Sequence, residues 1–88
     1  MDINEIRSRI DAVDERLLEA FLERMRCVDE VAEYKKLNGL FLENRVREQE
    51  ILQKVQDNSG NYGEYAQEFF STLIELSKSR QNELLEAN

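Results

Sequence analysis

The sequence predicts an all-α fold with three helices per chain, a long first helix, and assembly into an intertwined homodimeric helical bundle. Apolar residues recur every three or four positions along most of the chain, which is the spacing of one face of an α-helix. The 88 residues include no proline, and each glycine lies between periodic segments. The first periodic segment is also too long for a compact chain of this size.

Length, charge and composition narrow the class of protein. One domain spanning residues 1–88 is expected. The net charge of -7 argues against non-specific binding to nucleic acid or an anionic membrane. No apolar run approaches the ~20 residues of a membrane span and no signal peptide is visible, so we expect a cytoplasmic protein. The absence of histidine removes the commonest general base and the usual zinc ligand sets. Cys27, the single cysteine, is expected to be a small buried hydrophobe.

The first helix is expected to follow Asp2 and to run to about Lys36. Asp2 can cap it, with Glu5 completing a capping box, and Asn38-Gly39 is a helix stop. The apolar seam of this helix consists of Ile3, Ile6, Ile10, Val13, Leu17, Ala20, Cys27, Val31 and Tyr34. The seam is one continuous surface for packing.

Two shorter helices are expected after a connection at residues 40–43. The second runs from about Asn44 to Asp57, and residues 58–63 are expected to form a loop. The third runs from about Glu64 to Leu85. The apolar face of the second helix consists of Ile51, Leu52 and Val55, and that of the third of Ala66, Phe69, Phe70, Leu73, Ile74 and Leu84.

The length of the first helix predicts a homodimer. About 35 residues at 1.5 Å each give roughly 50 Å, whereas a compact chain of this size is roughly 30 Å across. Because the seam stays apolar along its whole length, the protruding part must be buried by another chain. A symmetric homodimer with paired first helices is the simplest arrangement.

Arg24 interrupts the seam with a positive charge. A cation on a packing face costs several kcal/mol unless an anion meets it, so either the chain supplies that anion or a ligand does. Lys35 lies eleven residues later, about 20° around the helix and roughly 16 Å along it. The two side chains could bracket a small molecule.

Polar residues also lie on or beside the packing stripes of the other two helices. They are Asn44, Arg47 and Glu48 on the second helix and Ser77 and Gln81 on the third. If the helices pack together, these groups meet in a polar pocket inside a helical bundle. Alternatives remain open: Arg24 and Lys35 could pair with Glu48 and other acids in a buried salt-bridge network, and the other polar residues could be ordinary polar positions on a solvated helix face.

With these positions identified, the chain resembles the all-helical chorismate mutases of the AroQ class along essentially its whole length. The resemblance rests on an ordered set of motifs at characteristic separations. They are Ile6-Arg7-Ser8-Arg9-Ile10-Asp11-Ala12-Val13-Asp14, Glu23-Arg24, Val31-Ala32-Glu33-Tyr34-Lys35, Asn44-Arg45-Val46-Arg47-Glu48 and Ser77-Lys78-Ser79-Arg80-Gln81.

The resemblance implies a binding site shared by two chains. One chain supplies Arg24, Lys35, Asn44, Arg47, Glu48, Ser77 and Gln81, and the partner chain supplies Arg7. Arg7 and Arg24 lie about 25 Å apart on one helix, too far to contact one small ligand, but an antiparallel partner helix could bring them together. Asn44 stands where the family often has aspartate, a mild departure because an amide still forms hydrogen bonds.

The implied function is the pericyclic (Claisen) rearrangement of chorismate to prephenate in phenylalanine and tyrosine biosynthesis, an isomerase reaction that needs no cofactor or metal. Catalysis would rest on restraint of the flexible dianion and on stabilisation of negative charge at the ether oxygen, with Lys35, Gln81 and Arg24 as the catalytic residues. Two alternatives use the same scaffold: an isochorismate-pyruvate lyase and a non-catalytic helical dimerisation module.

Overall fold

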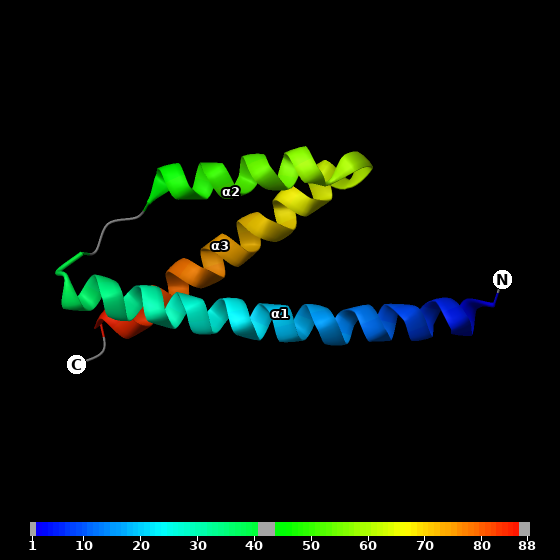
Figure 1. Cartoon of the computed structure of the whole chain (residues 1–88), viewed down its shortest axis with the longest axis horizontal. Coiled ribbons are helices and arrows are strands. Elements are labelled where there is room, and N and C mark those ends of the chain that lie inside the picture. Colours follow the sequence, from blue (N-terminus) through cyan, green and yellow to red (C-terminus); the bar gives the residue numbers. More distant parts are fainter. Residues whose placement is uncertain (1, 41–43, 87–88) are drawn as a thin grey trace.

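The fold is all-α, as the sequence predicts. The computed structural model describes residues 2–40 and 44–86 (Figure 1). Within these residues it contains three α-helices, α1 (Ile3–Leu37), α2 (Arg45–Asn58) and α3 (Gly63–Glu86), a short 3₁₀ turn η1 (Gly60–Tyr62), and no strand. None of the described helices combines the length and apolarity that a membrane span requires.

Both ends of α1 are fixed by local hydrogen bonds that the sequence indicates. The Asp2 side chain accepts a hydrogen bond from the backbone N–H of Asn4 at 3.0 Å. At the other end, Gly39 adopts φ +66°, and the N–H of Leu40 reaches back to the carbonyl of Lys35 at 2.7 Å. Glycine suits this left-handed turn because it has no Cβ. The helix therefore ends one residue beyond the expected Lys36.

The start of α2 is as expected, but the connection between α2 and α3 is shorter than the loop predicted at residues 58–63. Asn44 caps α2 by accepting a hydrogen bond from the N–H of Arg47 at 2.9 Å. Asn58 still belongs to α2, residues 60–62 form η1, and Gly63 already begins α3. Ser59 is the C-cap of α2, and Gly60 follows it at φ +55°, the left-handed conformation in which many helices end. The connection expected at residues 40–43 falls mostly on residues 41–43, which lie outside the described residues.

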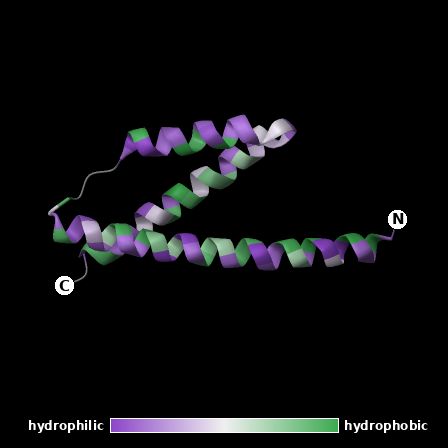
Figure 2. Cartoon of the chain, viewed as in Figure 1, coloured by the Kyte–Doolittle hydropathy of each residue, from purple (hydrophilic) through white to green (hydrophobic). Residues whose placement is uncertain are grey.

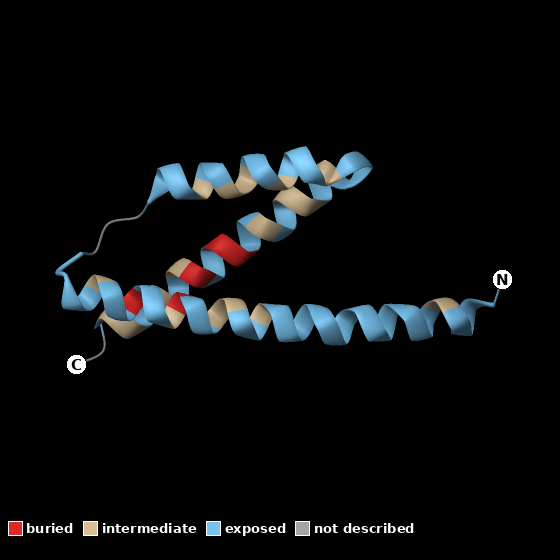
Figure 3. Cartoon of the chain, in the orientation of Figure 1, coloured by how far each residue is buried: buried red, intermediate tan, exposed pale blue. Residues whose placement is uncertain are grey.

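Helix α3 runs diagonally between α1 and α2 and packs on both (Figure 1). Among the described residues, the buried apolar ones are Val28 and Ala32 of α1 and Leu73 and Ile74 of α3, and Figure 3 shows buried segments in the C-terminal half of α1 and along the middle of α3. The buried stripe of α1 is therefore displaced by one position from the expected Cys27 and Val31. Ala32 is only 1% exposed, and its small side chain lets α3 approach closely at this point.

Cys27 and Phe69, which the sequence predicts to be interior, are exposed in the single chain. Cys27 lies at the surface rather than in the core. Phe69 is also exposed, although its ring packs edge-on against Phe70 with centroids 5.6 Å apart. The other residues expected on the apolar faces of α2 and α3 are partly or fully buried.

The N-terminal half of α1 extends beyond the other helices (Figure 1). The chain measures 56 × 27 × 14 Å and has a radius of gyration of 16.3 Å, against about 12 Å for a compact chain of this length. Ile10, Val13 and Leu17 are 51%, 48% and 46% exposed along this half, and Figure 2 shows apolar residues recurring along it. One chain by itself leaves most of the predicted seam in water.

Candidate active site

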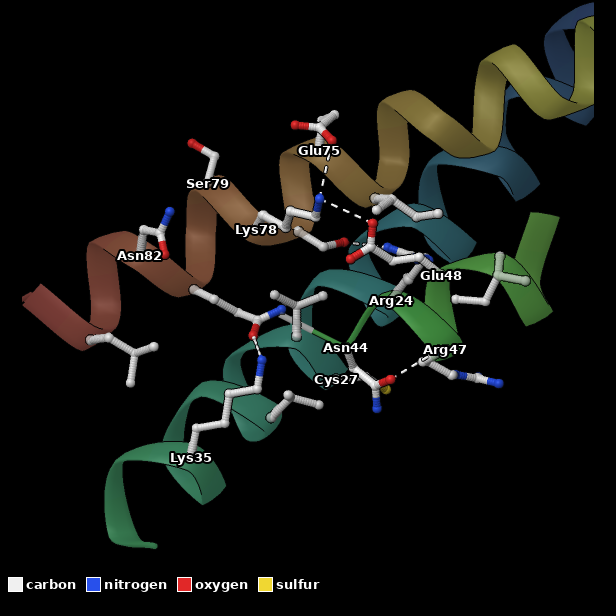
Figure 4. Close-up of a pocket in the computed structure, with 17 residues that line it drawn as sticks. Arg24, Cys27, Lys35, Asn44, Arg47, Glu48, Glu75, Lys78, Ser79 and Asn82 are labelled. Atoms are coloured by element: carbon white, nitrogen blue, oxygen red, sulfur yellow. Dashed lines mark hydrogen bonds and ion pairs between the residues drawn. The ribbon is translucent and has the colours of Figure 1, made fainter. Parts of the chain in front are cut away.

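A pocket of about 660 Å³ opens between the C-terminal half of α1, the start of α2 and the C-terminal half of α3 (Figure 4). Seven of the eight predicted site residues line it: Arg24, Lys35, Asn44, Arg47, Glu48, Ser77 and Gln81. Three helices that are distant in sequence thus converge on one cavity, the size of a small-molecule site.

Arg24 enters the pocket from α1 and contacts α3. Its Nη1 donates to the hydroxyl oxygen of Ser77 and, at 3.5 Å, to the backbone carbonyl of Leu73. The Ser77 hydroxyl, which is buried, donates to the same carbonyl at 2.7 Å. Every partner of the guanidinium in this cluster is therefore electrically neutral.

Lys35 lies at the other end of the pocket and also has a neutral partner. Its Nζ donates to Oε1 of Gln81 at 2.7 Å, across the gap between α1 and α3 (Figure 4). Accepting through Oε1 leaves both N–H bonds of the Gln81 amide available as donors. The pair therefore presents an ammonium and an amide NH₂ side by side.

Neither Arg24 nor Lys35 forms an ion pair with any carboxylate among residues 2–40 and 44–86. The alternative in which these two cations are neutralised by Glu48 is wrong, because the Glu48 carboxylate is held by Lys78 at 3.0 Å. Two partly buried positive charges thus face the pocket with neutral hydrogen-bond partners, an arrangement that favours an anionic ligand.

Arg47 borders the pocket without directing its guanidinium into it. The side chain is 66% exposed and lies 3.6 Å from the carboxylate of Glu50, and Figure 4 shows it pointing away from Lys35. The geometry in the single chain matches the solvated alternative for this residue. Asn44, by contrast, is fixed beside the pocket by its capping bond.

Arg7 does not belong to the pocket of its own chain. It lies seventeen residues before Arg24 on the same helix, about 25 Å along the axis, in the protruding half of α1. Its assignment to the site through a partner chain stays a prediction.

Sequence reasoning missed several residues that line the pocket, and Lys78 and Cys27 are two of them. Lys78 lies 3.0 Å from Glu48 and 3.4 Å from Glu75, measured from its Nζ to the nearest carboxylate oxygens. Its place directly after Ser77, one turn from Glu75, was the available signal. Cys27 lines the same wall of α1, and its placement one turn after Arg24 could have indicated this.

A salt bridge outside the predicted set fixes α3 against α1 near the pocket. Arg80 binds Asp29 through two hydrogen bonds of 2.8 and 3.1 Å. These hydrogen bonds, opposed by partial desolvation and reinforced by the charge of Arg80, hold the pKa of Asp29 below its ordinary value. The same interaction raises the pKa of Arg80. This bridge helps to set the position of the neighbouring Gln81.

The pocket offers cations, amides, two hydroxyls and two carboxylates, those of Glu48 and Glu75. Histidine is absent from the sequence, and no three acidic or sulfur side chains of the described residues gather closely enough to hold a metal ion. Such a set can bind and orient a small anion and stabilise developing negative charge.

The sequence model of the family described as chorismate mutase type II matches residues 6–82. This range includes Arg7 and every residue that lines the pocket up to Asn82. No curated protein and no solved structure matches the chain.

Proposed function

Because the chain belongs to the type II chorismate mutase family, a family of isomerases, we propose that its pocket converts chorismate to prephenate. The family match covers most of the chain and supports this activity. Assignment of roles to individual residues is our proposal and follows from the charges and hydrogen bonds of the pocket.

The observation that carries the proposal is the pair of cations without a carboxylate partner. Arg24 and Lys35 meet only neutral groups among the described residues. Chorismate carries two carboxylates, and a bound dianion would supply the missing negative charge. An arginine fork suits a carboxylate because it can donate two parallel hydrogen bonds.

The rearrangement is pericyclic, so the pocket has to transfer no proton and form no covalent intermediate. Its first task is to hold the flexible dianion in the compact reactive conformer, which we assign to Arg24 and to Arg7 of the partner subunit. Its second task is to stabilise negative charge on the ether oxygen as the C–O bond breaks. Lys35 and the free amide N–H of Gln81 are suited to donate there, because the Lys35 Nζ already lies 2.7 Å from Oε1 of the same amide group.

The remaining polar residues would orient the substrate. Glu48 can accept a hydrogen bond from the ring hydroxyl, and the amide NH₂ of Asn44 remains a donor because its Oδ1 makes the capping bond. Ser77 would assist Arg24 at one carboxylate. Arg47 would support carboxylate binding after a change of side-chain rotamer, since its guanidinium is turned outward in the single chain.

We propose that the functional unit is a homodimer with antiparallel α1 helices. For Arg7 of one chain to lie beside Arg24 of the other, the twofold axis must pass near Glu15 and Arg16, midway between them. The exposed seam residues on both sides of this point would then pack against the same residues of the partner chain and be buried. Such burial stabilises by about 1.5–3 kcal/mol for each large apolar side chain that becomes fully covered.

The cytoplasm is the compartment we propose. The sequence has one cysteine and therefore no internal disulfide, which fits a reducing environment.

The direct test is the loss of chorismate ultraviolet absorbance on adding purified protein, with prephenate identified as the product. Isochorismate is assayed in parallel, because release of pyruvate from it would instead indicate the lyase alternative. If neither substrate reacts and prephenate does not raise the melting temperature, the chain is a non-catalytic dimerisation module and our proposal is wrong.

A further inference from the structure

We propose that Lys78 is a positioning residue for Glu48 and acts on substrate binding through that carboxylate. The inference rests on the proposed function, in which Glu48 accepts a hydrogen bond from the substrate hydroxyl. The Nζ of Lys78, on α3, lies 3.0 Å from Oε1 of Glu48, on α2. Their side chains are 26% and 22% exposed, so solvent screens the pair only in part.

The ion pair with Lys78 holds the Glu48 side chain across the gap between α2 and α3. Helix α2 packs on α3, and the carboxylate stands at the edge of the pocket between them (Figure 4). A glutamate side chain has several rotamers, and an ammonium at 3.0 Å selects among them. The carboxylate is thereby oriented before the substrate arrives, which lowers the entropy cost of binding.

Lys78 also offsets a charge conflict. Glu48 is an anion beside a pocket that is proposed to bind a dianion, and like charges at short range repel. The Lys78 ammonium, paired with one oxygen of the Glu48 carboxylate, reduces that repulsion and leaves the second oxygen free to accept a hydrogen bond.

The surroundings of Lys78 distinguish it from Arg24 and Lys35. Its Nζ lies between two carboxylates, Glu48 at 3.0 Å and Glu75 at 3.4 Å (Figure 4). Arg24 and Lys35 have neutral partners and retain their charge for a ligand. The charge of Lys78 is already compensated within the protein, so its effect on the substrate is indirect.

A double-mutant cycle tests this inference. Lys78→Met, Glu48→Gln and the double variant are compared with the wild type in steady-state chorismate turnover. We expect Lys78→Met to raise KM roughly tenfold while kcat changes less than about threefold. In the Glu48→Gln background the same substitution should raise KM less than about twofold, because the effects of interacting residues are not additive. Lys78→Arg, which keeps the cation, should restore most of the affinity.

Controls separate the positioning effect of Lys78 from a loss of folding and from the loss of any one positive charge. Lys36→Met removes an exposed lysine of α1 that does not line the pocket, and its KM should equal that of the wild type. Melting temperatures show whether each variant folds, and Lys78→Gln serves if the methionine variant does not. Additive losses from Lys78→Met and Glu48→Gln, or a wild-type KM in Lys78→Met, would overturn the inference.

Failure of the inference is distinguishable from failure of the proposed function. If the wild type does not consume chorismate, the proposed function fails, and the four proteins of the cycle are then titrated with prephenate by calorimetry. A Lys78 effect that disappears in the Glu48→Gln background would still support the positioning role. Additive effects, or no binding of prephenate, would overturn it.

Discussion

Replacing Arg24 with leucine should abolish most catalysis without weakening the fold. The substitution removes two hydrogen bonds, to Ser77 and to the carbonyl of Leu73, each with a net value of about 0.5–1.5 kcal/mol. Neither buried group loses its last partner, because the Ser77 hydroxyl still donates to Leu73 at 2.7 Å. Removing a partly buried cation that has no carboxylate partner offsets the loss.

We therefore expect the free energy of unfolding of Arg24→Leu, without ligand, to lie within about 1 kcal/mol of the wild-type value or above it. Catalysis should fall by roughly 10²–10³-fold, the usual cost of losing one such electrostatic contact, about 3–4 kcal/mol of barrier. The same loss should appear as weaker binding of prephenate.

The assay pairs urea unfolding with chorismate kinetics on one preparation. Arg26→Leu is the matched control, since Arg26 is an exposed arginine on the same helix that does not line the pocket, and both its stability and its activity should stay near wild type. A loss of more than about 2 kcal/mol in Arg24→Leu would show that the guanidinium holds the fold together. Near-wild-type turnover by the folded variant would show that it does not bind substrate.

Three further predictions concern other parts of the molecule. Lys35→Met should lower kcat by roughly 10²-fold or more with little change in melting temperature, because it removes a proposed ether-oxygen donor but only one hydrogen bond within the protein, to Gln81. A large fall in melting temperature alongside the fall in kcat would contradict this role. Leu17→Glu, on the exposed seam, should give a monomer by sedimentation with no turnover; an active dimer would refute the predicted interface. The depressed pKa of Asp29 means that its bridge to Arg80 stabilises the fold above the unfolded carboxyl pKa of about 3.9 and stops doing so as pH falls through the folded pKa. The stability difference between wild type and Asp29→Asn should therefore vanish on acidification, and a difference that grows at low pH would contradict the sign.

The helices and their main boundaries could be predicted because local chemistry sets them. Asp2 and Asn44 cap helices through their own side chains, and Gly39 ends α1 by adopting a positive φ. Such signals depend on a few neighbouring residues. The predicted loop at 58–63 is too long, because residues that favour turns can also stand at the first position of a helix, as Gly63 does in α3.

The exact packing of the helices could not be predicted from the sequence. The crossing of α3 selects Val28 and Ala32 of α1 for burial and leaves Cys27 exposed, a shift of one residue around the helix. Apolar spacing alone accommodates either stripe.

The residues of the candidate pocket could be identified from misplaced polar side chains, but their pairing could not. Arg24 and Lys35 stood out because they interrupt or flank an apolar seam. That Glu48 pairs with Lys78, and that Arg47 turns toward Glu50, depends on how α2 and α3 approach each other and on side-chain rotamers.

A catalytic site shared by two chains is tested most directly by mixing defective homodimers. Arg7→Ala and Arg24→Ala homodimers should each be nearly inactive, because every site lacks one carboxylate-binding arginine. A heterodimer of the two has one intact site and one doubly defective site, so its chorismate turnover should recover to about half the wild-type value. No recovery in confirmed heterodimers would contradict the shared site.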